Sequence, residues 1–428
     1  MTDAGWIILT GVLVATSCAL LGTFLVLRKM SLLGDALSHA VLPGIAIAFF
    51  LSDSRAILPM FIGAAAFGLL TTLLVEAFHR RWAVPEDASI GIVFTALFAL
   101  GVVLISVYAG QVDLDQECVL YGEIAYTPFD TLLWDNQEYG PRPVWILSGV
   151  LIFNLLFVGL LYKELTLASF DPGLSLSVGV SATLIHYLLM GAVSITTVAS
   201  FESVGAILVV AMLIVPGASA YLWSDRLPRI LGLAVIFGAV SAVAGYYLAG
   251  LWNSSIAGAI VVVLGVIFGV SVLVAPRQGL LAKLLQRGRL SIQVAQDHIL
   301  LGMVRQVETG ADQTWRLRDA LGLASVHPWM ARQAMRLLRR KGLVALEADA
   351  TVDLTADGRR QGLQLLRGHR LWETYLNQLG LPQDHVHGPA DAVEHYLDQS
   401  LRQEIGGLVA DVGLDPQGKR IPDDSQNH

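Results

Sequence analysis

The chain has 428 residues, of which 54% are hydrophobic, and its mean hydropathy of +0.61 excludes an ordinary soluble enzyme of this length. Its two cysteines, Cys18 and Cys118, are too few for a disulfide framework. The net charge of -7 conceals a division, because nine of the 28 Lys and Arg residues precede Pro276 and the other nineteen follow it. This asymmetry predicts a membrane part followed by a charged, soluble part.

Long apolar runs fill the first part of the chain. A helix needs about twenty apolar residues to cross a membrane, and by this test we predict about nine spans. They cover roughly residues 6–27, 33–51, 57–78, 89–108, 144–162, 180–199, 203–223, 230–250 and 256–275. The N-terminus carries Asp3 and no basic residue before Trp6, so we expect the first span to be retained rather than cleaved as a signal peptide.

Basic residues fall on one side of these spans. That side holds Arg28, Lys29, Arg80, Arg81, Lys163, Arg226, Arg229 and the cluster from Arg277 to Arg289. The other side keeps only Arg55 and Arg142. Because cytoplasmic loops carry the excess of Lys and Arg, the pattern predicts a cell-membrane protein with its N-terminus outside and its C-terminus in the cytoplasm.

Asp35 and His39 lie in the apolar stretch from Leu33 to Ala48. Four residues apart on a helix, they project from one face. A carboxylate and an imidazole are costly inside a membrane, so such a pair is by default a functional hypothesis, and its donor atoms suit a divalent transition metal. The alternative is that Asp35 caps the helix at the membrane edge and that His39 is a packed, hydrogen-bonded residue.

A second polar interruption, from Ser200 to Gly205, is expected between the sixth and seventh spans. Its Glu202 would lie nearer the outer side than Asp35 and His39, so the three side chains would mark successive points on one cation route. The alternative reading makes Glu202 an exposed loop residue or a helix cap. We interpret His186 as a packed histidine rather than a ligand.

The segment between the fourth and fifth spans is acidic, from Asp113 to Glu138, with Arg142 as its basic residue. Such a surface raises the local concentration of cations. It is equally consistent with a loop that only keeps the protein solvated, and we assign no ligand here.

The seventh span runs into the stretch from Pro216 to Arg229. A Pro-Gly break followed by small residues predicts a short surface helix suited to docking a partner. The chain has no GxxxxGK[ST] phosphate loop, so ATP hydrolysis, if it drives this protein, requires another subunit.

Three segments of the membrane part, GDALSHAVLPGIAIAF, KELTLASFDP and SFESVGAILVVAMLIVPGASAYLWSDRL, resemble the permease subunit of the ABC importers that take up manganese, zinc or iron. The resemblance covers nearly all of residues 1–275. It implies a permease dimer, homomeric or heteromeric, a cytoplasmic ATPase subunit and an extracytoplasmic metal-binding protein. The metal-path positions of the family match Asp35, His39 and Glu202. Its ATPase-contacting loop is similar to the Pro216 to Arg229 stretch, with the contacts at Gly217, Ser224, Asp225 and Arg226.

The soluble part begins with a basic linker, residues 276–290. TWRLRDALGL and HPWMARQAMRLLRRKGLV then predict two helices, and VALEADATVDLT predicts a β-hairpin. Together they predict a winged helix-turn-helix domain over residues 291–360. The second helix has a basic face, formed by Arg332, Arg336, Arg339, Arg340 and Lys341, that would meet phosphates. Helices of this kind also occur in protein contact modules.

Two clusters of nitrogen and oxygen donors follow in residues 361–428. His369 and Glu373 are spaced i and i+4, whereas His387, Asp391, Glu394 and His395 form one helical stripe. The absence of a thiolate among them favours Mn²⁺ or Fe²⁺ over structural zinc. Chance placement on a solvated helix is the alternative.

LTADGRR, GHRLWETYL, VHGPADAVEHYL and PQGKRIP resemble the iron- and manganese-dependent metalloregulators. That resemblance places Asp391, Glu394 and His395 in a primary metal site. It places His369, Glu373 and His387 in a second site.

We therefore expect a mostly α-helical protein with a polytopic membrane domain, a winged helix-turn-helix and a helical metal-binding and dimerisation domain. The expected function is that of a permease, not an enzyme, in a divalent-metal importer with manganese favoured, zinc or iron as alternatives, and a fused metal sensor. The rival is a membrane-anchored, metal-dependent transcription regulator that binds DNA. A third reading makes the C-terminal part a dimerisation module without functional metal sites.

Overall fold

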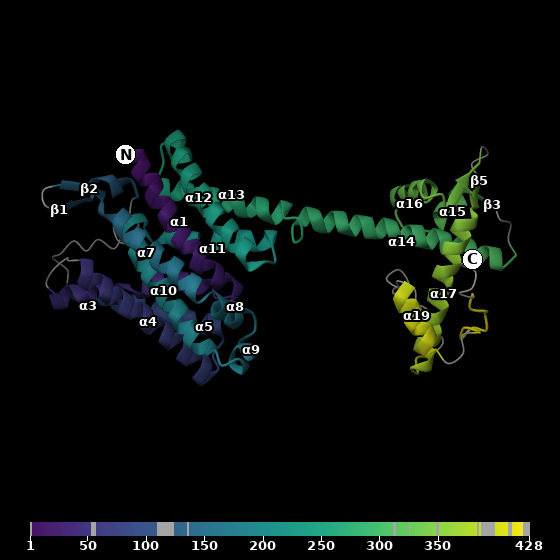
Figure 1. Cartoon of the computed structure of the whole chain (residues 1–428), viewed down its shortest axis with the longest axis horizontal. Coiled ribbons are helices and arrows are strands. Elements are labelled where there is room, and N and C mark those ends of the chain that lie inside the picture. Colours follow the sequence, from purple (N-terminus) through teal and green to yellow (C-terminus); the bar gives the residue numbers. More distant parts are fainter. Residues whose placement is uncertain are drawn as a thin grey trace. The chain divides into compact units, whose positions relative to one another are not determined.

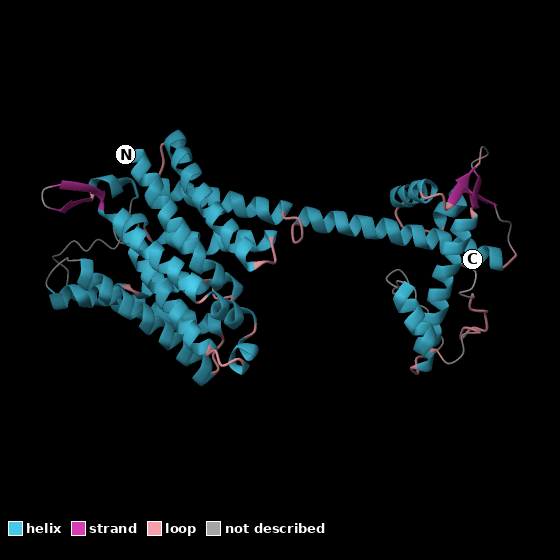
Figure 2. Ribbon diagram, viewed as in Figure 1, coloured by secondary structure: helices cyan, strands magenta, loops and turns pink. Residues whose placement is uncertain are grey.

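The computed structural model describes residues 2–52, 57–108, 124–134, 137–310, 314–324, 326–347, 351–382, 385–386, 399–409 and 413–422. The chain divides into two compact units, Met1–Ala282 and Lys283–His428. Figures 1 and 2 show that helices dominate both units. The mostly helical fold class is confirmed.

Nine helical segments in the described part of the first unit are long and apolar enough to cross a membrane, as predicted. Eight of them are α1 (Asp3–Leu27), α4 (Ile57–Trp82), α5 (Glu86–Tyr108), α7 (Arg142–Leu160), α10 (Ala182–Val204), α11 (Ala206–Trp223), α12 (Leu227–Trp252) and α13 (Ile256–Val274). The ninth consists of α2 (Leu32–Ala40) and α3 (Leu42–Ser52), separated at Val41. The chain is therefore a multi-pass membrane protein.

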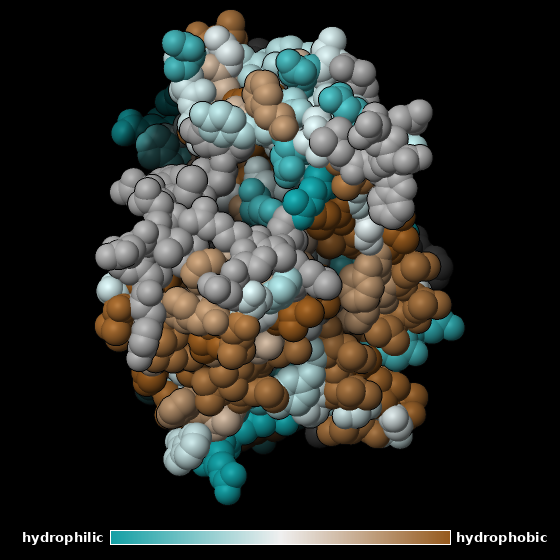
Figure 3. All heavy atoms as spheres, turned by 90° about the vertical axis from the view of Figure 1, so that its left-hand side faces the viewer, coloured by the Kyte–Doolittle hydropathy of each residue, from teal (hydrophilic) through white to brown (hydrophobic). Residues whose placement is uncertain are grey.

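The spans differ in burial. α1 and α10 bury most of their length inside the unit, whereas α5 and α13 leave most of theirs exposed. Figure 3 shows apolar side chains gathered over a large part of one face of the molecule. α1 and α10 therefore form the centre of the membrane unit, and α5 and α13 form its periphery. The exposed apolar side chains of the peripheral helices are suited to contact with lipid.

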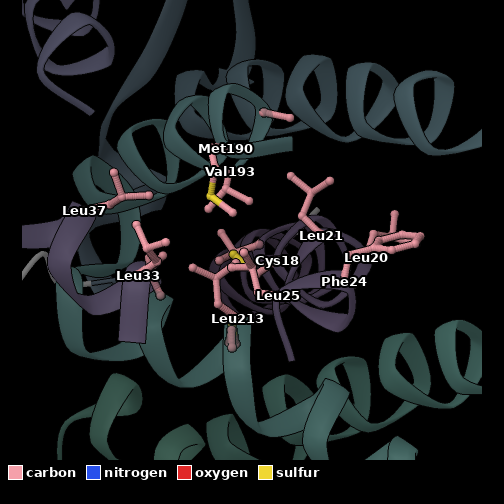
Figure 4. Close-up of a cluster of buried hydrophobic side chains, with 14 of the residues drawn as sticks. Cys18, Leu20, Leu21, Phe24, Leu25, Leu33, Leu37, Met190, Val193 and Leu213 are labelled. Atoms are coloured by element: carbon pink, nitrogen blue, oxygen red, sulfur yellow. The ribbon is translucent and has the colours of Figure 1, made fainter. Parts of the chain in front are cut away.

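The centre of this unit is a buried apolar cluster. Figure 4 shows Cys18 and Leu21 of α1, Leu37 of α2, Met190 of α10 and Leu213 of α11 pointing toward one another. These five side chains are fully buried. The cluster fixes α2, and with it the polar pair that α2 carries, against α1, α10 and α11.

Small residues let the central helices approach closely. A Cβ atom added to Gly22 of α1 would lie 1.8 Å from the carbonyl oxygen of Leu213 on α11. Gly44 of α3 and Gly63 of α4 face each other in the same way, each within 2.3 Å of the other's carbonyl oxygen by this measure. Because the hydrophobic effect does not drive helices together in lipid, membrane helices commonly associate through such close contacts at small residues.

Two predicted helix breaks are wrong. Residues 200–204 continue α10, and the break comes only at Gly205, whose φ of +81° suits glycine. Glu202 therefore lies in the last helical turn rather than between spans. α11 continues through Pro216 to Trp223, so no separate surface helix follows the Pro-Gly pair.

Short elements connect the spans. η1 (Ile124–Phe129) and the hairpin of β1 (Thr131–Trp134) and β2 (Gln137–Pro141) precede α7. The KELTLASFDP segment forms most of α8 (Tyr162–Phe170) and the start of α9 (Pro172–Ser177). The acidic residues before Ile124 lie outside the described residues.

The second unit starts with most of α14 (Leu280–Glu308) and continues with β3 (Thr314–Arg316), α15 (Leu317–Gly322), α16 (Pro328–Arg340), β4 (Val344–Leu346) and β5 (Thr351–Leu354). The strands form an antiparallel sheet in the order β3-β5-β4. This confirms the predicted hairpin. The first predicted helix is shorter than expected, because Thr314, Trp315 and Arg316 pair with β5 as a strand.

Two helices complete the described part of this unit, α17 (Ala356–Gln378) and α19 (Gln399–Leu408). The Thr355 side chain caps α17 by accepting a hydrogen bond from the Gly358 amide. Leu371 of α17 packs with Ile405 of α19 and with Ile421 near the C-terminus. This small core holds the PQGKRIP segment next to α17.

Candidate functional site

Asp35 and His39 lie one helical turn apart on α2, with Nε2 of His39 3.7 Å from Oδ1 of Asp35. The His39 ring meets Phe98 of α5 edge to face at a centroid distance of 5.4 Å. This contact fixes the direction of the imidazole. The predicted pair is thus brought together, with one carboxylate and one imidazole facing the same space.

The exposure of this pair has a physical consequence. The Asp35 side chain is 52% exposed and that of His39 is 30% exposed, although α2 belongs to a span. A carboxylate in direct contact with lipid is costly, so charged groups of this kind face an aqueous cavity or another protein surface. The pair is therefore open to a cation or to a second subunit.

Glu202 lies apart from this pair. A Cβ atom on Gly68 of α4 would contact both Ser194 of α10 and Leu37 of α2, so α2 passes α10 near Ser194. Glu202 lies about two helical turns further along α10, or about 12 Å. Its side chain is exposed, and the charges of Arg142 and Asp130 act on it. Asp35, His39 and Glu202 do not form one ligand cluster.

Sequence reasoning missed a buried pair that involves α10. Along this helix the pair lies before Ser194, whereas Glu202 lies after it. Nε2 of His186 on α10 lies 3.2 Å from Oε2 of Glu76 on α4. Glu76 also forms an ion pair with Arg80, one turn later on α4. A carboxylate inside a predicted span was the available signal. The pairing agrees with the interpretation of His186 as a packed, hydrogen-bonded residue.

Arg28 stands at the end of α1 and belongs to the same end of the bundle. Its Nε donates a hydrogen bond to Ser169 Oγ of α8 at 3.0 Å. Burial lowers the pKa of the Arg28 guanidinium to about 10. Arg28 therefore stays protonated at neutral pH and keeps this end of the unit positively charged.

The residues matched to the ATPase-contacting loop lie in two settings. Gly217 is buried within α11, where its added Cβ would lie 3.1 Å from Thr23 Cα of α1. Ser224 caps the α11–α12 connection, because its Oγ accepts a hydrogen bond from the Arg226 amide at 3.2 Å. Asp225 and Arg226 are exposed, and Asp225 forms an ion pair with Arg277.

His369 and Glu373 lie on α17, with His369 Nε2 3.1 Å from Glu373 Oε1. Both side chains are almost fully buried. A buried nitrogen and oxygen donor pair at this spacing fits a divalent metal of the manganese, iron or zinc group. Within the described ranges no group of three or more His, Cys, Asp or Glu side chains is placed to hold a metal. The remaining predicted ligands, His387, Asp391, Glu394 and His395, lie outside the described residues.

Arg370, the residue after His369, is a buried connector. Its guanidinium donates to both carboxylate oxygens of Glu308, at 3.1 and 2.7 Å, and lies 3.4 Å from Asp415. Asp415 in turn accepts hydrogen bonds from the Gln417 and Lys419 amides. Arg370 thereby ties the end of α14 and the C-terminal segment to the helix that carries His369 and Glu373.

Comparison with known proteins identifies both parts of the chain. Residues 4–275 match the ABC 3 transport family, and residues 355–423 match the iron dependent repressor, metal binding and dimerisation domain. Both resemblances predicted from the sequence are confirmed.

The matches to two known relatives cover nearly the whole length of each relative. The manganese transport system membrane protein MntD of Bacillus subtilis (strain 168) is 50% identical over 286 residues, covering 67% of this chain and 97% of MntD. The zinc transport system membrane protein TroD of Treponema pallidum (strain Nichols) is 38% identical over 360 residues, covering 82% of this chain and 96% of TroD.

Among solved structures, PsaBC from Streptococcus pneumoniae in complex with Fab matches with 34% identity and a TM-score of 0.55. The match covers 65% of this chain and 94% of the matched chain. The present chain belongs to the ABC 3 transport family and carries, after its membrane unit, a domain of the iron dependent repressor type.

Proposed function

We propose that this chain is the membrane permease subunit of an ATP-driven importer of divalent metal ions. Mn²⁺ is the favoured cargo, with Zn²⁺ or Fe²⁺ as alternatives. The observation that carries the proposal is the half-exposed Asp35 beside His39 on a membrane-spanning helix. The relatives named for manganese and zinc transport support the same cargo class.

The Asp35–His39 pair acts as a station on the metal path. Its carboxylate oxygen and imidazole nitrogen replace part of the hydration shell of a divalent ion. Two protein ligands leave the ion incompletely coordinated, so water or the same pair on a second permease subunit completes the shell. Partial coordination suits transport, since the ion must also leave. Glu202, about 12 Å beyond Ser194 along α10 by helical rise, attracts the ion at an earlier point.

Membership of the ABC 3 transport family suggests the remaining components of the importer. A cytoplasmic ATPase subunit contacts the connection that holds Ser224, Asp225 and Arg226, while Gly217 keeps α11 against α1 beneath it. An extracytoplasmic metal-binding protein delivers the ion to the outer side, near Glu202. In the orientation that the distribution of Lys and Arg favours, the N-terminus lies outside and the repressor-type domain lies in the cytoplasm.

The C-terminal domain senses metal that has entered the cell. His369 and Glu373 provide a buried donor pair, and the family resemblance adds His387 to this second site. The same resemblance assigns Asp391, Glu394 and His395 to a separate, primary site. Regulation requires that the metal bind with different affinity to two states of the transporter.

Uptake measurements test the permease assignment. In cells that express the complete importer, Asp35→Ala and His39→Ala should each lower Mn²⁺ uptake by about tenfold or more, equivalent to about 1.4 kcal/mol or more. Ser38→Ala is the matched control, because the Ser38 hydroxyl only donates to the Gly34 carbonyl within α2. Undiminished uptake in both ligand variants would remove the proposed path. Competition by Zn²⁺ and Fe²⁺ in the same assay ranks the cargo ions.

ATPase measurements test the sensor. The reconstituted importer should change its ATPase rate with Mn²⁺, and a chain that ends at Pro276 should lose the part of this response that depends on the C-terminal domain. Identical responses would assign the domain another role.

A second candidate function is supported by the exposed basic face of α16. Arg332, Arg336, Arg339 and Arg340 are exposed, and none forms a salt bridge with another residue of the described structure. A membrane-anchored regulator would use this face to hold DNA phosphates. Retention of duplex DNA that falls steeply with salt and is lost on Arg336→Gln would favour this function.

A further inference from the structure

The exposed loop between α11 and α12 is tied to the start of the linker toward the metal-binding domain. Asp225 lies in that loop, and Arg277 follows the last span, α13. Arg277 Nη1 forms an ion pair with Asp225 Oδ2. Both residues belong to the membrane unit. The pair therefore joins the predicted ATPase contact to the first residues of the linker.

A second contact lies next to this ion pair and joins the end of α11 to α13. Trp223 Nε1, at the end of α11, donates a hydrogen bond to Ser271 Oγ of α13 at 3.0 Å. Ser271 is buried, and the Trp223 ring also meets Phe237 of α12 edge to face. The end of α11 is thus fixed to α13, and the exposed residues Asp225 and Arg226 follow directly after it.

The chain between α13 and α14 makes a tight turn. The Gly279 amide donates to the Ala275 carbonyl, and a Cβ on Gly279 would lie 2.4 Å from that oxygen. Ala275 is fully buried. α14 starts directly after this turn, at Leu280, and runs as one helix to Ile299 and Leu300, which lie in the core of the second unit. Arg277 therefore sits in the turn that directly precedes α14, the helix that continues into the second unit.

We propose that Arg277 is a positioning residue through which the metal-binding domain controls the ATPase-contacting loop. This inference rests on the proposed function and adds the route of regulation. A change in α14 on metal binding moves the Ala275–Gly279 turn, and Arg277 carries that movement to Asp225. The loop then meets the ATPase subunit in a more or a less productive position.

The strength of the contact suits a modulator. The side chains of Arg277 and Asp225 are 69% and 57% exposed, and ion pairs in such settings bias a conformation rather than lock it. Breaking the pair is therefore expected to reduce the metal response of the ATPase about twofold to fivefold without unfolding the protein.

The experiment uses the full chain in the reconstituted importer and measures the ratio of ATPase rates with and without Mn²⁺. Arg277→Gln should bring this ratio toward one. The charge exchange Arg277→Asp with Asp225→Arg should restore part of the wild-type ratio, and Arg277→Lys should retain most of it. Recovery in the exchange would show that the pairing of the two charges, and not either side chain alone, carries the metal response.

Lys283→Gln is the matched control. Lys283 is exposed on the same linker, and no ion pair joins it to another described residue. Its substitution removes the same charge and should leave the ratio unchanged. If wild type responds to Mn²⁺ and Arg277→Gln responds equally, the inference is overturned while the sensor function stands. If wild type itself shows no response that depends on the C-terminal domain, the sensor function fails.

Discussion

Nε2 of His186 on α10 lies 3.2 Å from Oε2 of Glu76 on α4, and the two side chains are only 10% and 13% exposed. This pair joins two spans within the membrane unit. Removing one partner of a buried pair leaves an uncompensated polar or charged group, at a cost of about 3 kcal/mol. Glu76→Leu and His186→Leu should each lower the apparent melting temperature of the detergent-solubilised protein by several degrees.

A double variant separates pairing from simple loss of either residue. Glu76→Leu with His186→Leu removes both polar groups, so its melting temperature should exceed that expected from adding the two single effects. Arg81→Gln is the control, since Arg81 is exposed at the end of α4. Strict additivity of the two single effects would show that the contact contributes little.

Helix approach gives a second prediction. Gly22→Ala would place a methyl group against the Leu213 carbonyl of α11, so α1 and α11 must separate. We expect a loss of about 3 kcal/mol, measured as a lower melting temperature and a lower yield of folded protein.

Gly149→Ala provides the matched comparison on another span, because no described atom outside its own stretch of helix backbone lies within 4 Å of the Cβ it would add. That variant should be neutral or slightly more stable, since alanine favours helix over glycine. Equal losses in the two glycine variants would contradict the role assigned to close packing.

Metal binding by the C-terminal domain gives a third prediction. His369→Ala and Glu373→Ala should each weaken Mn²⁺ binding by the full-length protein by about tenfold or more, equivalent to about 1.4 kcal/mol. The affinity is measured by removing metal from the protein with a chelator and then titrating the protein with Mn²⁺. At a free Mn²⁺ concentration of about one hundred times Kd, the metal should stabilise the native domain by about 2.7 kcal/mol. His327→Ala, at the exposed start of α16, should bind as wild type.

The nine membrane spans found in the described part of the first unit were predictable because apolar length is read directly from the sequence. The break between the sixth and seventh spans was placed too early for a physical reason. Ser200 and Glu202 are polar, but a helix accommodates polar residues: the Ser200 hydroxyl donates to the Thr196 carbonyl. The helix ends only where Gly205 adopts a positive φ.

At Pro216 the sequence predicted a break where the helix in fact continues. Proline normally interrupts a helix, yet neighbouring membrane helices can support the freed backbone groups, and α11 continues to Trp223. The i and i+4 pairs Asp35–His39 and His369–Glu373 were predictable, since helical spacing alone brings them together. Contacts between distant segments, such as Glu76 with His186, depend on how whole helices pack, and no local pattern encodes them.

Arg370 shows how such a distant contact can be tested. It pairs with Glu308, which is about one-third exposed, and with Asp415, whose side chain is 1% exposed. The buried carboxylate depends more on its partner, because it has lost its water and also holds the Gln417 and Lys419 amides. Asp415→Asn should therefore destabilise the C-terminal segment more than Glu308→Gln. Hydrogen exchange of the amides from Leu414 to Ile421 would measure the order, and faster exchange in Glu308→Gln than in Asp415→Asn would contradict it.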